Sequence, residues 1–198
     1  AVAGAIAAKY LSPANIDRIG IVGTGTQAKL QLQYLKNVID CNKVMVWGRS
    51  SNSLSDYIKS MDNYNYQVEP TASIDDIVKQ CQLIITCTPS EKALIDEVNP
   101  GTHITAIGSD TTSKRELSSR VLLRADVVIT DSKSQCKERG EIYQASKDGF
   151  LTSSALELGN IINGADVGRA NQEQITVADL TGVAVQDIQI SKAILRNL

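Results

Sequence analysis

The chain has 198 residues, 42% of them hydrophobic and 21% charged, which is typical of one soluble globular domain with a sizeable core. A formal net charge of −2 excludes a positive surface potential that would attract phosphates, and an aromatic content of 4% excludes a row of aromatic side chains on which bases could stack. We therefore expect no nucleic-acid partner. No apolar run reaches the ~20 residues that a membrane span needs, so we expect no membrane partner and a cytoplasmic location.

In chain order, the apolar patterns predict alternating strands and helices over the first 130 residues. We expect strand 18–22, helix 26–39, strand 43–47, helix 53–61, strand 66–69, helix 73–80, strands 82–86 and 103–107, helix 116–124 and strand 126–130. The strands are apolar on both faces, which indicates a parallel sheet covered by helices on both sides. The predicted fold class is therefore α/β, a doubly wound Rossmann-type, mostly parallel sheet with helices on both faces.

The pattern weakens after about residue 140. There we expect a helix over 155–162, a strand over 175–180 and a helix over 186–195. We interpret residues 1–198 as one domain of a longer protein. The alternating core does not need the helix-like ends, residues 1–14 and about 183–198, and we expect both to pack on a missing domain.

Cysteines and histidine give no sign of a metal site. Cys41, Cys81, Cys87 and Cys136 lack a C-x-x-C spacing, and His103 is the only histidine. Such a set is typical of reduced thiols in a cytosolic protein. A zinc site needs more ligands of this kind than the chain offers, so we expect no metal.

A glycine turn lies between the first strand and the first core helix. Gly23, Gly25 and Ala28 have the G-x-G-x-x-A spacing. The first glycine permits a tight turn, the second lets a pyrophosphate approach the backbone, and the small third residue lets the helix pack closely. The context of strand, helix and second strand favours dinucleotide binding over a turn that merely connects two elements.

The second strand is followed by "GRSSNS" rather than by an acid. NAD-preferring sites usually place Asp or Glu there to accept hydrogen bonds from the ribose hydroxyls. Arg49 instead offers a donor fork suited to phosphate, and Ser50 can add a hydrogen bond. We therefore predict that NADP(H) is preferred, with NAD(H) as the alternative; a solvated surface arginine is the simpler interpretation.

Several longer motifs resemble the ornithine cyclodeaminase/mu-crystallin family. They occur in order as "GIVGTGTQA", "VWGRS", "IITCT", "PGTHITAIGSD", "KREL", "ADVVITDS" and "ITVADLTGVAVQD". The resemblance implies hydride transfer between a nicotinamide and the α-carbon of an amino acid or imine. It also implies an N-terminal substrate and dimerisation domain, absent here, through which the protein would form a homodimer.

The resemblance also implies a set of cofactor-binding residues. The pyrophosphate loop would be Gly23, Gly25, Thr26 and Gln27; the 2′-phosphate contacts Arg49 and Ser50; and the nicotinamide half Thr86, Cys87, Thr88, Thr181 and Gly182. Ordinary packing at the end of a strand is the alternative for residues 86–88.

Asp110 is the candidate catalytic residue. In catalytic relatives, an aspartate at this position faces substrate and nicotinamide, where a carboxylate can orient a cationic amine or iminium. The alternative is a turn or cap residue. Lys114 and Glu116 are interpreted as a solvated helix start, and Asp179 as a turn residue.

The resemblance implies an NADPH-dependent ketimine reductase that acts on pyrroline-2-carboxylate or piperideine-2-carboxylate. The alternatives are ornithine cyclodeaminase, which converts ornithine to proline and ammonia, alanine dehydrogenase, and a non-catalytic NADPH-binding module. The family's substrate-binding arginine and catalytic lysine lie upstream of Ala1, so we expect this chain alone to bind cofactor without turnover.

Overall fold

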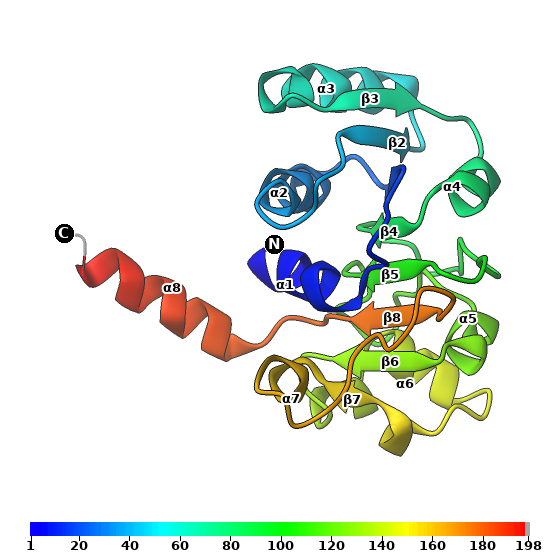
Figure 1. The fold of residues 1–198 in the computed structure, drawn as a ribbon, viewed down its shortest axis with the longest axis vertical. Coiled ribbons are helices and arrows are strands. Elements are labelled where there is room, and N and C mark those ends of the chain that lie inside the picture. The colour runs from blue at the N-terminus through cyan, green and yellow to red at the C-terminus, as the bar shows by residue number, and fades with distance from the viewer. Residues whose placement is uncertain (197–198) are drawn as a thin grey trace.

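The computed structural model describes residues 1–196, which form one eight-stranded sheet flanked by helices (Figure 1). The strand order is β3-β2-β1-β4-β5-β8-β6-β7, and every pairing is parallel. The strands are β1 Ile19–Val22, β2 Lys43–Trp47, β3 Gln67–Pro70, β4 Leu83–Thr86, β5 His103–Ala106, β6 Val127–Thr130, β7 Leu156–Glu157 and β8 Thr176–Asp179. The predicted α/β fold class is confirmed.

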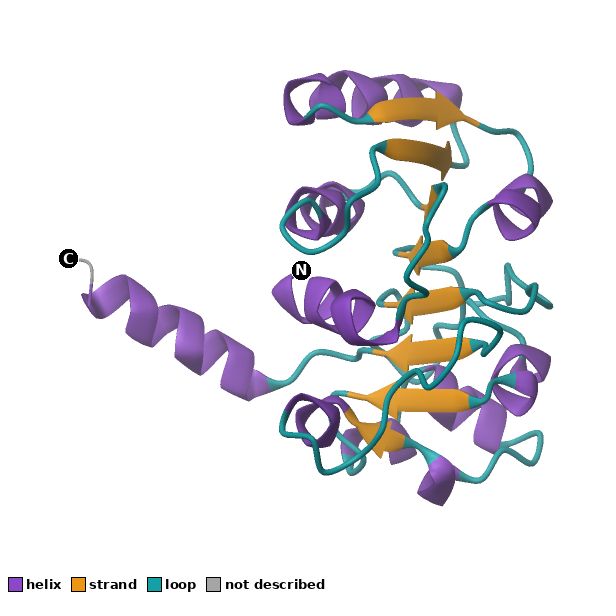
Figure 2. Ribbon diagram, in the orientation of Figure 1, coloured by secondary structure: helices purple, strands orange, loops and turns teal. Residues whose placement is uncertain are grey.

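Helices cover both faces of the sheet (Figure 2). They are α1 Val2–Leu11, α2 Thr26–Leu35, α3 Ser51–Met61, α4 Ile74–Gln80, α5 Ser119–Arg124, α6 Glu141–Ser146, α7 Leu158–Ile162 and α8 Ala184–Arg196. Short 3₁₀ turns are Asp62–Tyr64, Gln135–Lys137 and Thr152–Ser154. None of the helices in the described part is both long and apolar enough to cross a bilayer.

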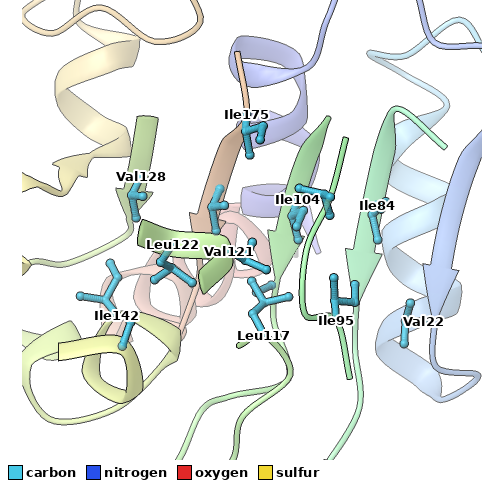
Figure 3. Packing of buried hydrophobic residues seen from close by; sticks show 14 of the residues in the cluster. Val22, Ile84, Ile95, Ile104, Leu117, Val121, Leu122, Val128, Ile142 and Ile175 are labelled. Atoms are coloured by element: carbon cyan, nitrogen blue, oxygen red, sulfur yellow. The ribbon is translucent and has the colours of Figure 1, made fainter. Parts of the chain in front are cut away.

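The core consists of two layers because successive strand residues point to opposite faces. In β4, Leu83 and Ile85 pack under α1, α2 and α3. Ile84, between them, lies on the opposite face with Ile104 of β5 and Leu122 of α5 (Figure 3), in a cluster that also contains residues of α4 and α6. All five side chains are buried. This arrangement explains why the strands are apolar throughout instead of alternating.

The strand order reverses between β1 and β4. From β1 the chain runs outward through β2 to β3, and it then returns to β4 on the other side of β1. Loops that diverge at such a point leave a crevice at the carboxyl ends of the strands, where open α/β sheets bind ligands. Residues 23–25 and 87–90 follow these two strands and therefore flank the crevice.

The fold departs from the sequence expectation mainly after residue 110. Residues 116–118 are not helical, and α5 begins at Ser119. α6 and β7 have no counterpart among the expected elements, because six and two residues are too few to show a period. The expected helix over 155–162 begins with β7 and becomes helical only at Leu158.

The two ends of the chain pack differently. Ala7 and Leu11 of α1 are fully buried against the sheet, so the expectation that the core does not need residues 1–14 is wrong. Contact of this segment with a further domain stays a prediction. α8 has no buried residue and projects away from the sheet (Figure 1). The last two residues of the expected segment 183–198 lie outside the described residues.

Candidate functional site

The turn between β1 and α2 leaves backbone groups open at the start of the helix. Gly23 has φ +119°, and a Cβ there would lie 2.6 Å from the carbonyl oxygen of Cys87. Gly25 is the N-cap of α2, without a side-chain cap, and a Cβ on it would meet nothing within 4 Å. The first amides of α2 therefore begin beside open space, as an anion-binding helix start requires.

A cleft of about 380 Å³ lies beside this turn. The glycine turn, the end of β2 and the loop after β4 line it: Gly23, Thr24, Gly25, Trp47, Gly48, Arg49, Ser50, Ser53, Cys87, Thr88, Pro89, Ser90 and Leu94. We call this space the glycine-turn cleft.

The glycine-turn cleft carries a positive charge at its mouth. Arg49 is exposed and forms no ion pair with any described residue. Ser50 caps α3, with its Oγ accepting a hydrogen bond from the Ser53 N–H at 3.2 Å. A free guanidinium next to a helix start suits a phosphate group. The described residues contain no cluster of side chains that could hold a metal ion.

A second pocket of about 240 Å³ lies between α1 and the ends of β5 and β8. Its lining includes Gln27, Asp110, Thr181 and Gly182, which come from three separate parts of the sequence. Asp110 is exposed, and its carboxylate accepts a hydrogen bond from the Lys114 ammonium at 2.7 Å. We call this space the Asp110 pocket; its lining includes the Asp110 carboxylate, which is paired with the Lys114 ammonium.

The predicted residues at the end of β4 and just after it separate into two groups. Cys87 and Thr88 line the glycine-turn cleft, and burial raises the pKa of the Cys87 thiol. Thr86 is fully buried, lines neither space and donates its hydroxyl to Glu116 at 2.8 Å. Thr26 opens α2 and also lines neither space. Direct contact of Thr86 and Thr26 with a cofactor stays a prediction.

Buried carboxyl groups behind the two spaces escaped the sequence analysis. Glu116 has no exposed surface, so its interpretation as part of a solvated helix start is wrong. Asp179 ends β8 and is fully buried, so it is not a turn residue. Burial, and then the neighbouring Asp179, raises the pKa of Glu141 to about 8; burial raises the pKa of Asp179 to about 7. For Glu116, the only sequence feature that pointed to burial was the apolar Leu117 directly after it.

One further carboxylate holds the loop after β8. The Gly182 N–H donates to Asp131 Oδ2 at 2.7 Å, and the Thr181 hydroxyl donates to Oδ1 at 3.3 Å. Gln135 Nε2 donates to the Thr181 hydroxyl at 2.7 Å. Asp131 follows β6, so the ends of β6 and β8 together shape this wall of the Asp110 pocket.

Known proteins are similar to this chain in both sequence and fold. The chain is 34% identical over 201 residues to alanine dehydrogenase from Archaeoglobus fulgidus, covering 98% of this chain and 61% of that protein. It is 31% identical over 194 residues to Δ1-pyrroline-2-carboxylate reductase from Bacillus cereus, covering 94% and 59%. The structure of iminosuccinate reductase from Paracoccus denitrificans in complex with NAD+ has a TM-score of 0.91 at 31% identity, covering 98% and 60%.

These relatives are longer than this chain, which spans about 60% of their length. The model of the ornithine cyclodeaminase/mu-crystallin family matches residues 1–198. That match covers the glycine turn, both spaces and the ends of all eight strands. The chain belongs to the ornithine cyclodeaminase/mu-crystallin family.

Proposed function

We propose that this chain is the dinucleotide-binding part of an NADP(H)-dependent oxidoreductase of the ketimine reductase type. Its substrate would be a cyclic imino acid such as pyrroline-2-carboxylate or piperideine-2-carboxylate. The observation that carries the proposal is the succession of an open helix start, a free guanidinium and an Asp110–Lys114 pair along one edge of the sheet. The NAD+ in the iminosuccinate reductase structure supports a dinucleotide ligand.

The glycine turn fits a pyrophosphate. Gly23 packs against the Cys87 carbonyl, and the space over Gly25 is open, so phosphate oxygens can approach the first amides of α2. Arg49 and Ser50 would hold the 2′-phosphate of NADP(H). Thr181 and Gly182 would line the nicotinamide end. A bound nicotinamide supplies or accepts the hydride.

Asp110 would act on the substrate. Its carboxylate can orient a cationic amine or iminium and stabilise that positive charge. The Lys114 ammonium at 2.7 Å restrains the carboxylate, and a substrate carboxylate would find the same ammonium attractive. Residues of an upstream domain would complete the pocket, with α8 packing on that domain and a homodimer forming through it.

Cofactor preference can be measured on this chain. Trp47 is the only tryptophan and lines the glycine-turn cleft, so its fluorescence reports binding of NADPH or NADH. We expect tighter binding of NADPH. Arg49→Ala should weaken NADPH binding about tenfold, because a charge-assisted hydrogen bond contributes about 1.5–3 kcal/mol, and should leave NADH binding within about twofold.

Arg120→Ala is the matched control. Arg120 is also exposed, but it belongs to α5 and does not line the glycine-turn cleft. It should change neither affinity. Tighter binding of NADH by the unaltered chain would overturn the NADP(H) preference, and no binding of either would overturn the dinucleotide proposal.

The reaction itself has to be measured on the intact protein. We expect NADPH oxidation with the two cyclic imino acids. Alanine dehydrogenase is the second candidate, favoured by the 34% identity to the Archaeoglobus fulgidus enzyme. NAD+ reduction with alanine would select it, and ammonia release from ornithine would select a cyclodeaminase. Sedimentation of the same sample tests the homodimer.

A further inference from the structure

Glu116 joins the loops that follow two neighbouring strands. Its Oε1 accepts a hydrogen bond from the Thr88 N–H at 2.6 Å, after β4. Its Oε2 accepts from the Gly108 N–H at 2.7 Å, after β5, and from the Thr86 hydroxyl at 2.8 Å. Both carboxylate oxygens are therefore committed to donors from outside the segment that carries Glu116.

These loops form the wall between the two spaces. Thr88 lines the glycine-turn cleft, whereas Ile107 and Asp110, on either side of Gly108, line the Asp110 pocket. The wall is thin. A Cβ on Gly108 would lie 2.2 Å from the Thr88 carbonyl oxygen and 2.5 Å from the Glu116 carboxyl carbon. No side chain larger than hydrogen fits there without moving one loop.

Other buried carboxyl groups hold Glu116 in turn. The backbone N–H groups of Glu116 and Leu117 donate to the two carboxyl oxygens of Glu141, at 2.7 and 3.1 Å. Next to Glu141, the Ile142 N–H donates to Asp179 Oδ2 at 2.8 Å, at the end of β8. Glu116 is thus anchored to the central strand β8 and not to a flexible surface.

A carboxylate is the group that this position needs. The Glu116 carboxyl accepts hydrogen bonds from the backbone amides of Thr88 and Gly108 and from the Thr86 hydroxyl. A glutamine of the same shape has only one acceptor oxygen, and its NH₂ would face an N–H donor. Burial raises the pKa of the Glu116 carboxyl, whereas the hydrogen bonds from Thr86, Thr88 and Gly108 lower it. These bonds therefore favour the charged form, which binds its donors more strongly and can restrain two loops.

We propose that Glu116 is a positioning residue that sets the separation of the glycine-turn cleft and the Asp110 pocket, so that one dinucleotide spans both. The inference rests on the proposed dinucleotide-binding function. The adenosine half would lie in the glycine-turn cleft and would not contact the wall between the two spaces. The nicotinamide half would have to pass it to reach Asp110.

The test compares a whole dinucleotide with its adenosine half. We expect Glu116→Gln to weaken NADPH binding about tenfold and to leave binding of 2′,5′-ADP within about twofold, both measured by calorimetry on the 198-residue chain. Gly108→Ala should have the same selective effect, because its added Cβ would push against the Thr88 carbonyl and the Glu116 carboxyl and so spread the wall, although the Glu116 side chain itself is retained. It keeps the test decisive if Glu116→Gln does not fold.

Asp126→Asn is the matched control. Asp126 also accepts a backbone hydrogen bond, from the Ile175 N–H at 2.8 Å, but at the amino edge of the sheet. This variant should lose stability without selective loss of NADPH. Equal losses of NADPH and 2′,5′-ADP in Glu116→Gln and Gly108→Ala, or no loss in either, would overturn the positioning role while wild-type binding still supports the proposed function. Failure of the unaltered chain to bind NADPH would overturn both.

Discussion

The two edges of the sheet both bury polar groups, but they use them differently. At the amino edge, His103 and Arg169 are paired with hydroxyl and carbonyl groups of the same edge. At the carboxyl edge, the buried Glu116 carboxyl group joins two loops, and the helix start and Arg49 keep free donors beside open space. A closed network stabilises the fold, whereas donors that face space are available to a ligand.

Around His103, the amino edge is closed because the hydrogen-bonding groups there are paired with one another. The Thr176 hydroxyl donates to the Leu11 carbonyl at 2.9 Å, so it accepts from His103 Nδ1 at 2.8 Å. His103 Nε2 then accepts from the Thr105 hydroxyl at 3.0 Å. The Arg169 guanidinium also donates to the Leu11 carbonyl, at 2.6 Å. These bonds fasten α1 to the starts of β5 and β8.

Arg169→Met should give the largest effect on stability. It removes the donors to the carbonyls of Leu11, Thr102 and Gln172, which are then left without this partner. We expect the free energy of unfolding to fall by about 3 kcal/mol in urea denaturation at pH 7, with 2′,5′-ADP binding retained. A loss below about 1 kcal/mol would show that the amino edge does not depend on this network.

Asp110→Asn should affect turnover and not stability, which is the reverse pattern. In the intact protein we expect kcat to fall about a hundredfold, because the amide cannot balance a positive charge on the substrate. NADPH affinity and the urea midpoint should stay close to those of the wild type. An unchanged kcat would remove Asp110 from the mechanism and weaken the contrast between the edges.

The two edges should also respond to pH with opposite signs. Burial, and then the Arg169 guanidinium, lowers the pKa of His103 to about 3; unfolding restores it to ~6.5, so this group's contribution to stability is lost as pH falls below about 6.5. The raised pKa of Asp179, about 7, has the reverse effect: its contribution is full at low pH and is lost as pH rises from ~3.8 to about 7.

Urea denaturation at pH 5 and pH 7 separates the two contributions. In His103→Gln, unfolding free energy should fall on going from pH 5 to pH 7, because only the carboxyl contribution is left. In Asp179→Asn it should fall less than in the wild type, or rise, over the same interval, because Glu141, with its pKa raised to about 8, still opposes the His103 contribution. Each change relative to wild type should be about 2 kcal/mol. The same slope in all three proteins would contradict both assignments.

Lys114→Met should have the smallest effect on stability. The Lys114–Asp110 pair is partly exposed, with 28% and 55% of the two side chains accessible, and exposed ion pairs contribute little. We expect a change of at most about 0.5 kcal/mol in unfolding free energy. A larger loss in urea denaturation would mean that this pair stabilises the loop, as the amino edge stabilises the fold.

The glycine turn could be predicted from the sequence because its features are local. Gly23, Gly25 and the flanking elements lie within one short stretch, and the strand over 43–47 matches β2 residue for residue. Glu116 could not be predicted in the same way. Its hydrogen-bond donors are on Thr86, Thr88 and Gly108. They surround the Glu116 carboxyl only when β4 and β5 are paired in the folded sheet.

The sequence by itself determined the α/β class, the family and the residues of the glycine turn, because periodicity and short motifs depend on neighbouring residues. Only the tertiary structure decided that β8 lies between β5 and β6 and brings Thr181 to Asp110. It also decided that α1 belongs to the core and that Glu116 is buried. These features depend on pairings between distant segments, and no local pattern of side chains encodes them.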